Sequence, residues 1–312
     1  MKILVTGGSG RIGFRTMQLL QKSGHKIVNL DIVPPKTTIG EFIEGRLTDR
    51  NLIDKATKDI DAILHLAAYP TEAAIPNYPE GWDVNCTGTF NIFEYAAKNR
   101  VKKVVYASSI CATGLITWVS SNHGIQYLPV DEDHPCRPHN LYGLSKVLAE
   151  EIARMHAARS ETSYIGLRFA TVWFDAPGGG PDDYTKMLID KFVRDPEALI
   201  KRPSEFATMF APMTADALKD LCWQYVGVWD VAEACKLALE KEDIKYGVYN
   251  IGGADTCSEF DSIKIAQMFY PGVPLRNPVV FLADKKAPLY DISKAQKELG
   301  FAPKLNWKDY VK

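Results

Sequence analysis

Tyr142 and Lys146 are the two side chains whose types and spacing most directly suggest chemistry. They lie four residues apart in the segment NLYGLSKVL, so on a helix they project from the same side. A free phenol titrates at about 10 and is a poor base at neutral pH, but a nearby ammonium group stabilises the phenolate and lowers its pKa. The pair could therefore exchange a proton with a substrate hydroxyl. An exposed helix face is the alternative interpretation, because the YxxxK spacing is common by chance.

A glycine-rich loop opens the chain. The first thirteen residues, MKILVTGGSGRIG, place Gly7, Gly10 and Gly13 after an apolar strand and at the start of a helix. Glycine permits the tight turn and the close approach of the backbone to a pyrophosphate, which the N–H groups of the helix start then face. Arg11 and Ile12 lie in that first turn. This context predicts a dinucleotide site, with a purely structural turn as the alternative.

Asp31 is the second marker of a dinucleotide site. It follows Gly13 by eighteen residues, at the end of the strand-like segment KIVNLD. A carboxylate at this position accepts hydrogen bonds from the ribose hydroxyls and repels a 2′-phosphate, which favours NAD over NADP. Arg11 could offset that repulsion, and a turn or capping role is the alternative for Asp31. With NAD bound, the Tyr142–Lys146 pair predicts hydride transfer at a substrate carbinol.

Apolar segments that alternate with amphipathic ones must position these residues. Runs that are apolar on both faces and are separated by helices predict a doubly wound α/β (Rossmann) fold with a parallel sheet. The expected strands are Lys2–Thr6, Lys26–Leu30, Ala62–Leu66, Lys103–Ala107 and Tyr164–Phe169, and the expected helices are Ile12–Lys22, Trp82–Lys98 and Asn140–Arg159. Helical spacing in the last helix predicts a buried stripe formed by Leu141, Leu144, Leu148, Ile152 and Met155.

The alternation of strand-like and helical segments becomes irregular after Phe169, where glycine and proline are frequent. It resumes with a strand-like segment at Tyr225–Val228, a helix at Asp230–Leu239 and a strand at Val248–Ile251. We therefore expect an NAD-binding Rossmann domain of residues 1–170 plus 223–251. A smaller substrate-binding lobe is expected from residues 171–222 plus 252–312.

Composition limits the other classes of function. The chain has 312 residues and a net charge of −1, so it lacks the basic excess of a nucleic-acid-binding protein. No apolar run reaches the roughly 18 residues of a membrane span, and no signal-peptide pattern is present. The six cysteines form no CxxC pair, so neither disulfides nor a metal site is expected. These features predict a cytoplasmic protein that binds neither nucleic acid nor membrane.

The motifs together resemble the extended short-chain dehydrogenase/reductase family, in its epimerase/dehydratase-like branch. The resemblance covers nearly the whole chain, and the motifs that carry it are TGGSGRIG (6–13), LHLAA (64–68), NCTGTFNIFEYA (85–96), VVYASS (104–109), YGLSK (142–146), LRF (167–169), VGVWDVAEA (226–234) and DISKAQKELGFAP (291–303).

The resemblance implies roles for individual residues. Ser109, five residues before Gly114, would hold the substrate oxygen beside Tyr142 and Lys146, with Ser108 in support. The implied cofactor contacts, besides the glycine loop and Asp31, are Leu47, Leu66, Ala67, Ala68, Asn85, Tyr142 and Lys146. A helix-kinking role is the alternative for Asn85, and His65 is expected to pack in the sheet.

A homodimer is a further implication of the family. Extended members often pair through the helix that carries the tyrosine and the helix before the fifth strand. The cluster of Phe90, Ile92 and Phe93 fits such an interface, and it fits burial inside one subunit equally well.

Departures from the family pattern bear on the substrate. Trp223 stands where many nucleotide-sugar enzymes carry an arginine that clamps the diphosphate, and Thr171 replaces an asparagine that binds the sugar nucleotide. The groups best suited to a diphosphate are thus missing. Trp118, Trp173, Trp223 and Trp229 could stack on a sugar ring, with packing as the alternative. Arg46 replaces the usual aspartate near adenine.

Further substrate contacts are expected from Tyr69, Ser109, Cys111 and Arg137. Cys111 matches an acid/base cysteine of some carbon-epimerising relatives, with packing as the alternative. The Asp-Glu pair of sugar dehydratases is replaced by Ile110 and Cys111, so dehydration is not expected. The segment 114–137, with Trp118, Asn122, His123 and His134, is expected to line the substrate mouth, where Arg137 or His139 could hold a carboxylate.

Three functions remain open at this level. The first is an NAD-dependent oxidoreductase of a small carbohydrate-type substrate, such as a free sugar, sugar acid or polyol. The second is a nucleotide-sugar 4-epimerase with tightly bound NAD, and the third is a non-catalytic NAD-sensing protein. Net production of NADH separates the first from the second, and the Ser109, Tyr142 and Lys146 set argues against the third.

Overall fold

Seven strands form one sheet in the order β3–β2–β1–β4–β5–β6–β9 in the computed structural model, which describes residues 1–115, 125–201 and 223–311. The pairs β1–β2, β2–β3, β1–β4 and β4–β5 are parallel. The strands are β1 (Lys2–Thr6), β2 (Lys26–Asp31), β3 (Glu41–Glu44), β4 (Ala62–His65), β5 (Lys103–Ser109), β6 (Ser163–Phe169) and β9 (Tyr246–Ile251). The predicted doubly wound α/β fold is confirmed.

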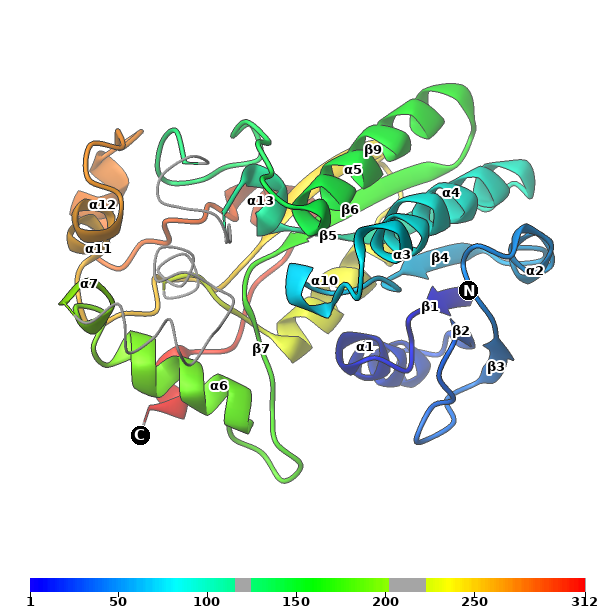
Figure 1. The fold of residues 1–312 in the computed structure, drawn as a ribbon, viewed down its shortest axis with the longest axis horizontal. Helices are drawn as coiled ribbons and strands as arrows, with labels where there is room; N and C mark the ends of the chain where they lie inside the picture. Colours follow the sequence, from blue (N-terminus) through cyan, green and yellow to red (C-terminus); the bar gives the residue numbers. More distant parts are fainter. Residues whose placement is uncertain (116–124, 202–222, 312) are drawn as a thin grey trace. The chain divides into compact units, whose positions relative to one another are not determined.

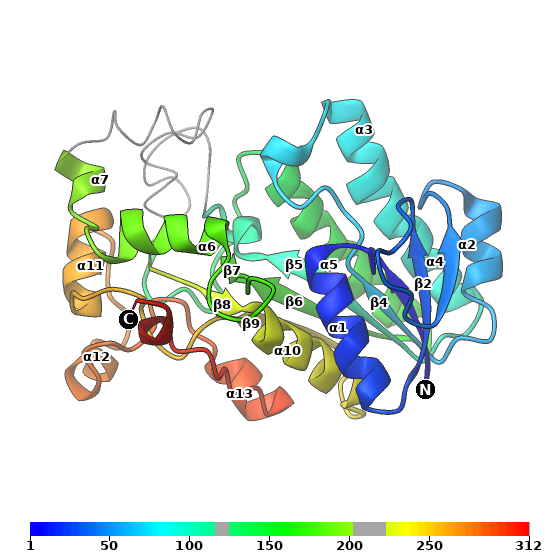
Figure 2. The same cartoon turned by 90° about the horizontal axis from the view of Figure 1, so that it is seen from below.

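Helices cover both faces of this sheet. Helices α4 and α5 lie side by side on one face, and α1 and α10 lie on the other (Figure 1, Figure 2). The helical segments are α1 (Arg11–Lys22), α2 (Arg50–Ala56), η1 (Glu72–Ala74), α3 (Tyr78–Trp82), η2 (Asp83–Thr87), α4 (Gly88–Lys98), α5 (Leu141–Arg159) and α10 (Val228–Glu240). The predicted helix Trp82–Lys98 is thus replaced by the end of α3, the π-helical turn η2 and α4. Strand β3 and helix α2 were not predicted.

The chain divides into two compact units. The first comprises Met1–Ser109, Leu141–Arg168 and Val231–Tyr249, and the second comprises Ile110–Asn140, Phe169–Asp230 and Asn250–Lys312. These units differ from the expected domain division in grouping residues 110–140, 169–170, 223–230 and 250–251 with the second. The core of the first unit forms between the sheet and its helices, from side chains such as Leu4, Ile63, Phe93, Val104 and Tyr164, all fully buried.

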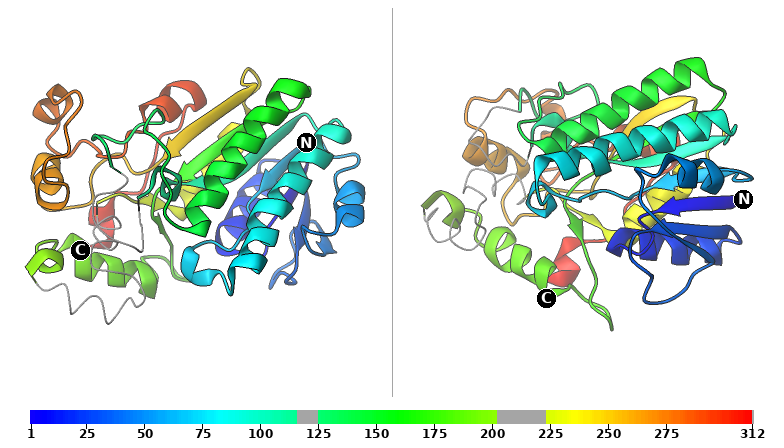
Figure 3. Two further views of the ribbon diagram at one scale, coloured as in Figure 1. Left: turned by 45° about the horizontal axis from the view of Figure 1, so that its top comes forward. Right: turned by 45° about the vertical axis from the view of Figure 1, so that its right-hand side comes forward.

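Helix α5 buries a different face from the one predicted. Leu144 and Met155 are 39% and 40% exposed, and Leu141, Leu148 and Ile152 are half-buried. The buried positions of the helix are instead Gly143, Ser145, Lys146, Ala149, Glu150, Ala153, His156 and Ala157. The predicted stripe is therefore wrong, because small residues let α5 lie close to β5 and α4, along which it runs in Figure 3.

The second unit is built from short elements. Strands β7 (Val172–Trp173) and β8 (Val226–Gly227) pair in parallel. The helical segments are η3 (Ile110–Thr113), α6 (Asp183–Leu188), η4 (Ile189–Val193), α7 (Ala198–Lys201), α11 (Ser262–Phe269), α12 (Val279–Ala283), α13 (Ser293–Leu299) and η5 (Trp307–Tyr310). Trp118, Asn122 and His123, which were expected near the substrate, lie outside the described residues. Among the residues that are described, no helix is both long and apolar enough to cross a bilayer.

Candidate active site

The glycine loop joins β1 to α1 with little room for side chains. Gly7 has a φ of +74°, and a Cβ there would come within 2.6 Å of the Ala67 nitrogen. A Cβ on Gly13 would lie 2.2 Å from the Gly7 oxygen. Gly10 is the N-cap of α1 and has no side chain that could accept a hydrogen bond from the first turn. The N–H groups of that turn are therefore suited to bind an anion. This loop fits a pyrophosphate.

Gly8 is a loop residue that the sequence motif did not single out. A Cβ on Gly8 would come within 2.3 Å of Asn29 and 2.7 Å of Met17. A larger residue would have to displace these two side chains of β2 and α1, and the motif spacing gives no sign of this packing.

Asp31 is held at the end of β2 by two backbone groups. Its Oδ2 accepts from the Ser9 N–H at 3.0 Å, and its Oδ1 accepts from the Val33 N–H at 3.1 Å. The carboxylate thus fixes the glycine loop to the segment that follows β2. Two acceptor oxygens have further lone pairs for ribose hydroxyls, so the geometry suits the predicted NAD contact.

The other predicted cofactor residues follow the carboxyl ends of adjacent strands. Leu47 comes after β3 and is buried, while Leu66, Ala67 and Ala68 come after β4 and are half-buried. The strand order places these segments beside the glycine loop and Asp31. Ligands of open α/β sheets bind at this edge, so the predicted set lies where one dinucleotide can reach it.

Asn85 secures the loop that follows β4. Its Oδ1 accepts from the Tyr69 N–H at 2.8 Å, and its Nδ2 donates to the Tyr69 oxygen at 3.2 Å. The phenol of Tyr69 donates to Glu80 at 3.3 Å, and Arg46 pairs with the same carboxylate oxygen at 3.2 Å. Asn85 thus positions the segment where a cofactor contact was predicted, and Arg46 is engaged by Glu80.

Ser109, Tyr142 and Lys146 come from β5 and the start of α5. Ser109 is the last residue of β5 and is 7% exposed. The Lys146 ammonium group donates to the Ala107 oxygen at 3.0 Å and lies 5.4 Å from the centroid of the Tyr142 ring. At 7% exposure, its charge is weakly screened. The arrangement suits proton transfer at an oxygen held by Ser109.

Two neighbours of Lys146 respond to the same surroundings. Burial, with a smaller contribution from the Lys146 charge, lowers the pKa of His65 to about 3. His65 contacts the hydroxyls of Thr6 at 2.7 Å and Thr89 at 3.0 Å, so it packs in the sheet as a neutral ring, as expected. Burial raises the pKa of Cys86 to about 11. Lys146 therefore contributes positive charge both to these two groups and beside the Tyr142 ring.

Glu72 is a residue of this region that no sequence signal identified. Its Oε2 accepts from the Tyr142 N–H at 2.9 Å. A carboxylate at the first turn of a helix satisfies an otherwise unpaired N–H group and interacts favourably with the helix dipole. Glu72 thus caps α5 at the tyrosine, from the short helical turn η1 seventy residues earlier in the chain.

The predicted substrate residues of the second unit are engaged in packing. Thr171 and Gln224 exchange two hydrogen bonds of 2.7 Å, from the Thr171 N–H and to the Thr171 hydroxyl. Trp223 is 1% exposed and donates to the Tyr270 hydroxyl at 2.8 Å. Trp173 is also 1% exposed. The expected stacking surfaces of Trp173 and Trp223 are therefore covered by protein.

Cys111 and Arg137 differ in accessibility. Cys111 is buried in η3, whereas Arg137 is exposed. Arg137 thus keeps the reach that a carboxylate-binding residue needs, and Cys111 has the burial typical of a packing thiol.

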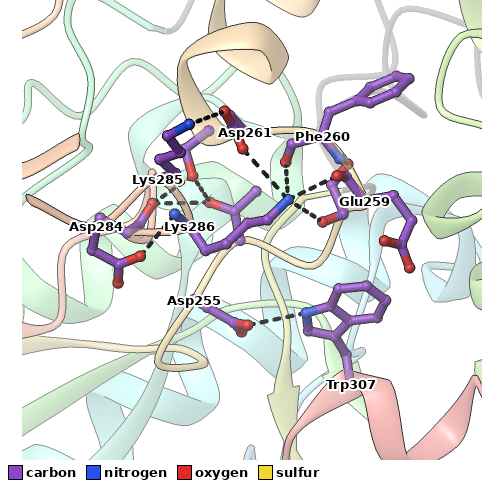
Figure 4. Close-up of polar contacts among 12 residues, drawn as sticks. Asp255, Glu259, Phe260, Asp261, Asp284, Lys285, Lys286 and Trp307 are labelled. Carbon is purple, nitrogen blue, oxygen red and sulfur yellow. Dashed lines mark hydrogen bonds and ion pairs between the residues drawn. The ribbon is translucent and has the colours of Figure 1, made fainter. Parts of the chain in front are cut away.

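Polar groups near the end of the chain stabilise loops of the second unit (Figure 4). Lys286 donates to the backbone oxygens of Ser258, Glu259 and Phe260 at 3.1, 2.8 and 2.8 Å. Asp255 accepts from the Trp307 indole at 3.0 Å. Each of these charged groups has its partners inside the unit. Within the described residues, no group of three or more His, Cys, Asp or Glu side chains could hold a metal ion.

The model of the NAD dependent epimerase/dehydratase family matches residues 3–252. The chain belongs to this family. A putative UDP-glucose 4-epimerase from Methanocaldococcus jannaschii is 30% identical, covering 99% of this chain and 96% of the relative. UDP-glucose 4-epimerase from Bacillus subtilis is 30% identical, covering 97% and 93%. The predicted family resemblance is confirmed, and membership makes the protein an NAD-dependent enzyme, not a non-catalytic sensor.

Solved structures show the same fold. MoeE5 in complex with UDP-glucose and NAD has a TM-score of 0.68 at 24% identity, covering 100% of this chain and 96% of MoeE5. A short-chain dehydrogenase/reductase superfamily protein from Agrobacterium tumefaciens with bound NAD has a TM-score of 0.69 at 22% identity, covering 100% and 95%. Both of these structures contain NAD.

Proposed function

We propose that this protein is an NAD-dependent 4-epimerase of a nucleotide sugar. The observation that carries the proposal is the Lys146 ammonium group, which lies beside the Tyr142 ring and is held by the Ala107 oxygen, two residues before Ser109 on β5. Full-length similarity to UDP-glucose 4-epimerases supports the substrate class. The comparisons thus favour the second reading of the sequence over net oxidation of a free sugar, which was its first.

The chain's own residues account for the proton movements of such a reaction. Bound NAD supplies the hydride acceptor and donor. The Ser109 hydroxyl holds the oxygen of the reacting carbinol, Tyr142 takes its proton, and Lys146 stabilises the phenolate that results. The ketone sugar then rotates within the site and presents the opposite face of its carbonyl group. When Tyr142 returns the proton to the oxygen, the configuration at that carbon is inverted. Cofactor and enzyme then end the cycle as they began it.

Net oxidation of a free sugar or sugar acid is the second candidate. It is favoured by the buried Trp223 in place of a diphosphate-clamping arginine and by the mutual hydrogen bonds of Thr171 and Gln224. A diphosphate would have to find other cations. Exposed Arg137 could hold the carboxylate of a sugar acid.

One experiment separates the two candidates. The NAD-loaded protein is incubated with UDP-glucose, UDP-galactose and a panel of free sugars and sugar acids, and proton NMR and NADH absorbance are followed together. An epimerase converts UDP-glucose and UDP-galactose into each other without accumulating NADH. Stoichiometric NADH from a free sugar or sugar acid, with no change in the UDP-sugars, would replace the epimerase proposal by the dehydrogenase. The Tyr142→Phe variant is the control for either activity.

We also propose that the protein forms a homodimer through α4 and α5. Phe90, Leu144 and Met155 are 39%, 39% and 40% exposed on these adjacent helices, whereas Ile92 and Phe93 are fully buried in the core. Exposed apolar side chains on neighbouring helices are typical of an interface. Sedimentation equilibrium should give a dimer for the parent and a monomer for Leu144→Glu.

A further inference from the structure

A buried ion pair lies directly behind the candidate active site. The carboxylate of Glu150 on α5 accepts from Arg168 of β6 at both oxygens, from Nε to Oε1 and from the terminal guanidinium nitrogen to Oε2, each at 2.8 Å. The hydroxyl of Ser108 donates to the same Oε1 at 2.6 Å. The side chains of Arg168 and Glu150 are only 5% and 7% exposed.

This network continues a column of residues along α5. Tyr142, Lys146 and Glu150 follow one another at intervals of four and so share one side of the helix. Lys146 donates to the Ala107 oxygen and Glu150 accepts from Ser108. Consecutive residues of β5 therefore hold consecutive turns of the helix, and the next residue of β5 is Ser109.

Stability alone does not explain such a network. A buried ion pair loses much of its Coulomb energy to desolvation, and apolar residues of similar volume often stabilise a fold equally well. The two hydrogen bonds from the Arg168 guanidinium have a second effect, because they fix the plane of the Glu150 carboxylate. Because Ser108 of β5 also bonds to this carboxylate, the network determines the position of α5 along the direction of β5.

We propose that Ser108, Glu150 and Arg168 are positioning residues that hold Tyr142 and Lys146 in register with Ser109. The inference rests on the catalytic roles in the proposed function. Reacting groups tolerate little misplacement, since a shift of about 1 Å can cost roughly a hundredfold in rate. We expect the network to act through the helix and strands that it joins, because its contacts are internal and buried.

Ser108→Ala is the sharpest test, because it removes one hydrogen bond and leaves the Glu150–Arg168 pair in place. We expect kcat to fall about tenfold, while KM and NAD affinity change less than about twofold. Ser108→Thr, which restores a hydroxyl, should recover most of the rate. Thr57→Val is the matched control, because it removes a buried hydroxyl of the same unit at the end of α2 and should leave kcat unchanged.

A readout without substrate tests the same inference. The alkaline absorbance titration of each protein, minus that of its own Tyr142→Phe partner, isolates the Tyr142 phenolate. Displacement of Lys146 in Ser108→Ala should move the midpoint upward by about one pH unit, a tenfold change in the ionisation constant. Glu150→Gln gives a second perturbation of the same network if Ser108→Ala does not fold.

The outcomes separate positioning from packing. A lower melting temperature with unchanged kcat and an unchanged Tyr142 titration in Ser108→Ala would overturn the proposal and leave the network as core packing. In the Tyr142→Phe background, Ser108→Ala should cause no further loss of the residual rate, because coupled residues are not additive. If Tyr142→Phe itself leaves the activity intact, the proposed function fails, whereas the titration still decides whether Ser108 positions Lys146.

Discussion

Replacing Asp31 by Asn should shift the protein's preference from NAD toward NADP. The substitution removes the negative charge but keeps one amide oxygen, which can still accept from either Ser9 or Val33, the two backbone partners of Asp31. Hydrogen bonds to a charged acceptor contribute about 1.5–3 kcal/mol and neutral ones about 0.5–1.5 kcal/mol. The midpoints of these ranges differ by about 1.25 kcal/mol, which predicts roughly tenfold weaker binding of NAD.

Binding of NADP should change in the opposite direction. Two unit charges about 4 Å apart interact by about 4 kcal/mol near a protein surface. Asp31 is half-buried, and screening at such a position reduces the repulsion to about 1–2 kcal/mol. Removing it predicts roughly five- to thirtyfold tighter NADP binding. The ratio of the two dissociation constants should therefore change by about a hundredfold.

Isothermal titration of each cofactor into the parent and the variant measures that ratio directly. Asp49→Asn is the matched control. Asp49 also accepts from a backbone N–H, at the start of α2, and the substitution changes the net charge by the same amount. A parent protein that binds NADP as tightly as NAD, or an Asp31→Asn variant with an unchanged ratio, would refute the role given to this carboxylate.

Three further perturbations have defined outcomes. Tyr142→Phe should reduce kcat to less than a tenth, a barrier increase above about 1.4 kcal/mol, with NAD affinity retained in calorimetry; a rate above that level would exclude Tyr142 as the proton carrier. Glu72→Ala should lower the free energy of unfolding by about 1 kcal/mol in urea titrations through loss of the α5 cap, whereas Glu72→Gln, which keeps an acceptor, should lower it by less than half as much. Burial lowers the pKa of His65 to about 3 in the folded state, whereas its pKa in the unfolded chain is about 6.5. The unfolded chain therefore binds a proton first as the pH falls, and acid favours unfolding. Stability should thus fall by up to about 1.4 kcal/mol per pH unit as the pH drops from 6.5 toward 5, and a His65→Asn variant with the same slope would contradict this.

The sheet and the cofactor edge could be predicted because their signals are local. The apolar strands around Leu4 and Val28 and the glycines at positions 7, 10 and 13 impose their geometry over a few residues. Strand β3 was missed because its sequence, EFIE, does not alternate between apolar and polar residues, lies at the edge of the sheet and is too short to give a clear pattern.

The substrate residues could not be predicted in the same way. Thr171 and Trp223 were identified by their positions in family motifs, yet their partners Gln224 and Tyr270 are set by tertiary structure. A motif position specifies a residue type, whereas the availability of that residue depends on what packs against it. Glu72 is the reverse case, since a residue outside every motif caps the helix that carries Tyr142 through a contact over seventy positions.

Helix α5 shows why burial and apolar spacing can disagree at a functional site. Spacing favoured a buried leucine stripe, but the helix turns Lys146 and Glu150 inward, where both are buried. Burying two charges is unfavourable unless each has partners, and here the Ala107 carbonyl and the Arg168 guanidinium provide them. Those partners lie on β5 and β6, so no pattern within the helix reveals them. The leucines displaced from the interior are left half-buried or exposed on α5, and the neighbouring α4 carries the exposed Phe90. The orientation that serves the candidate active site therefore also creates the apolar surface proposed for dimerisation.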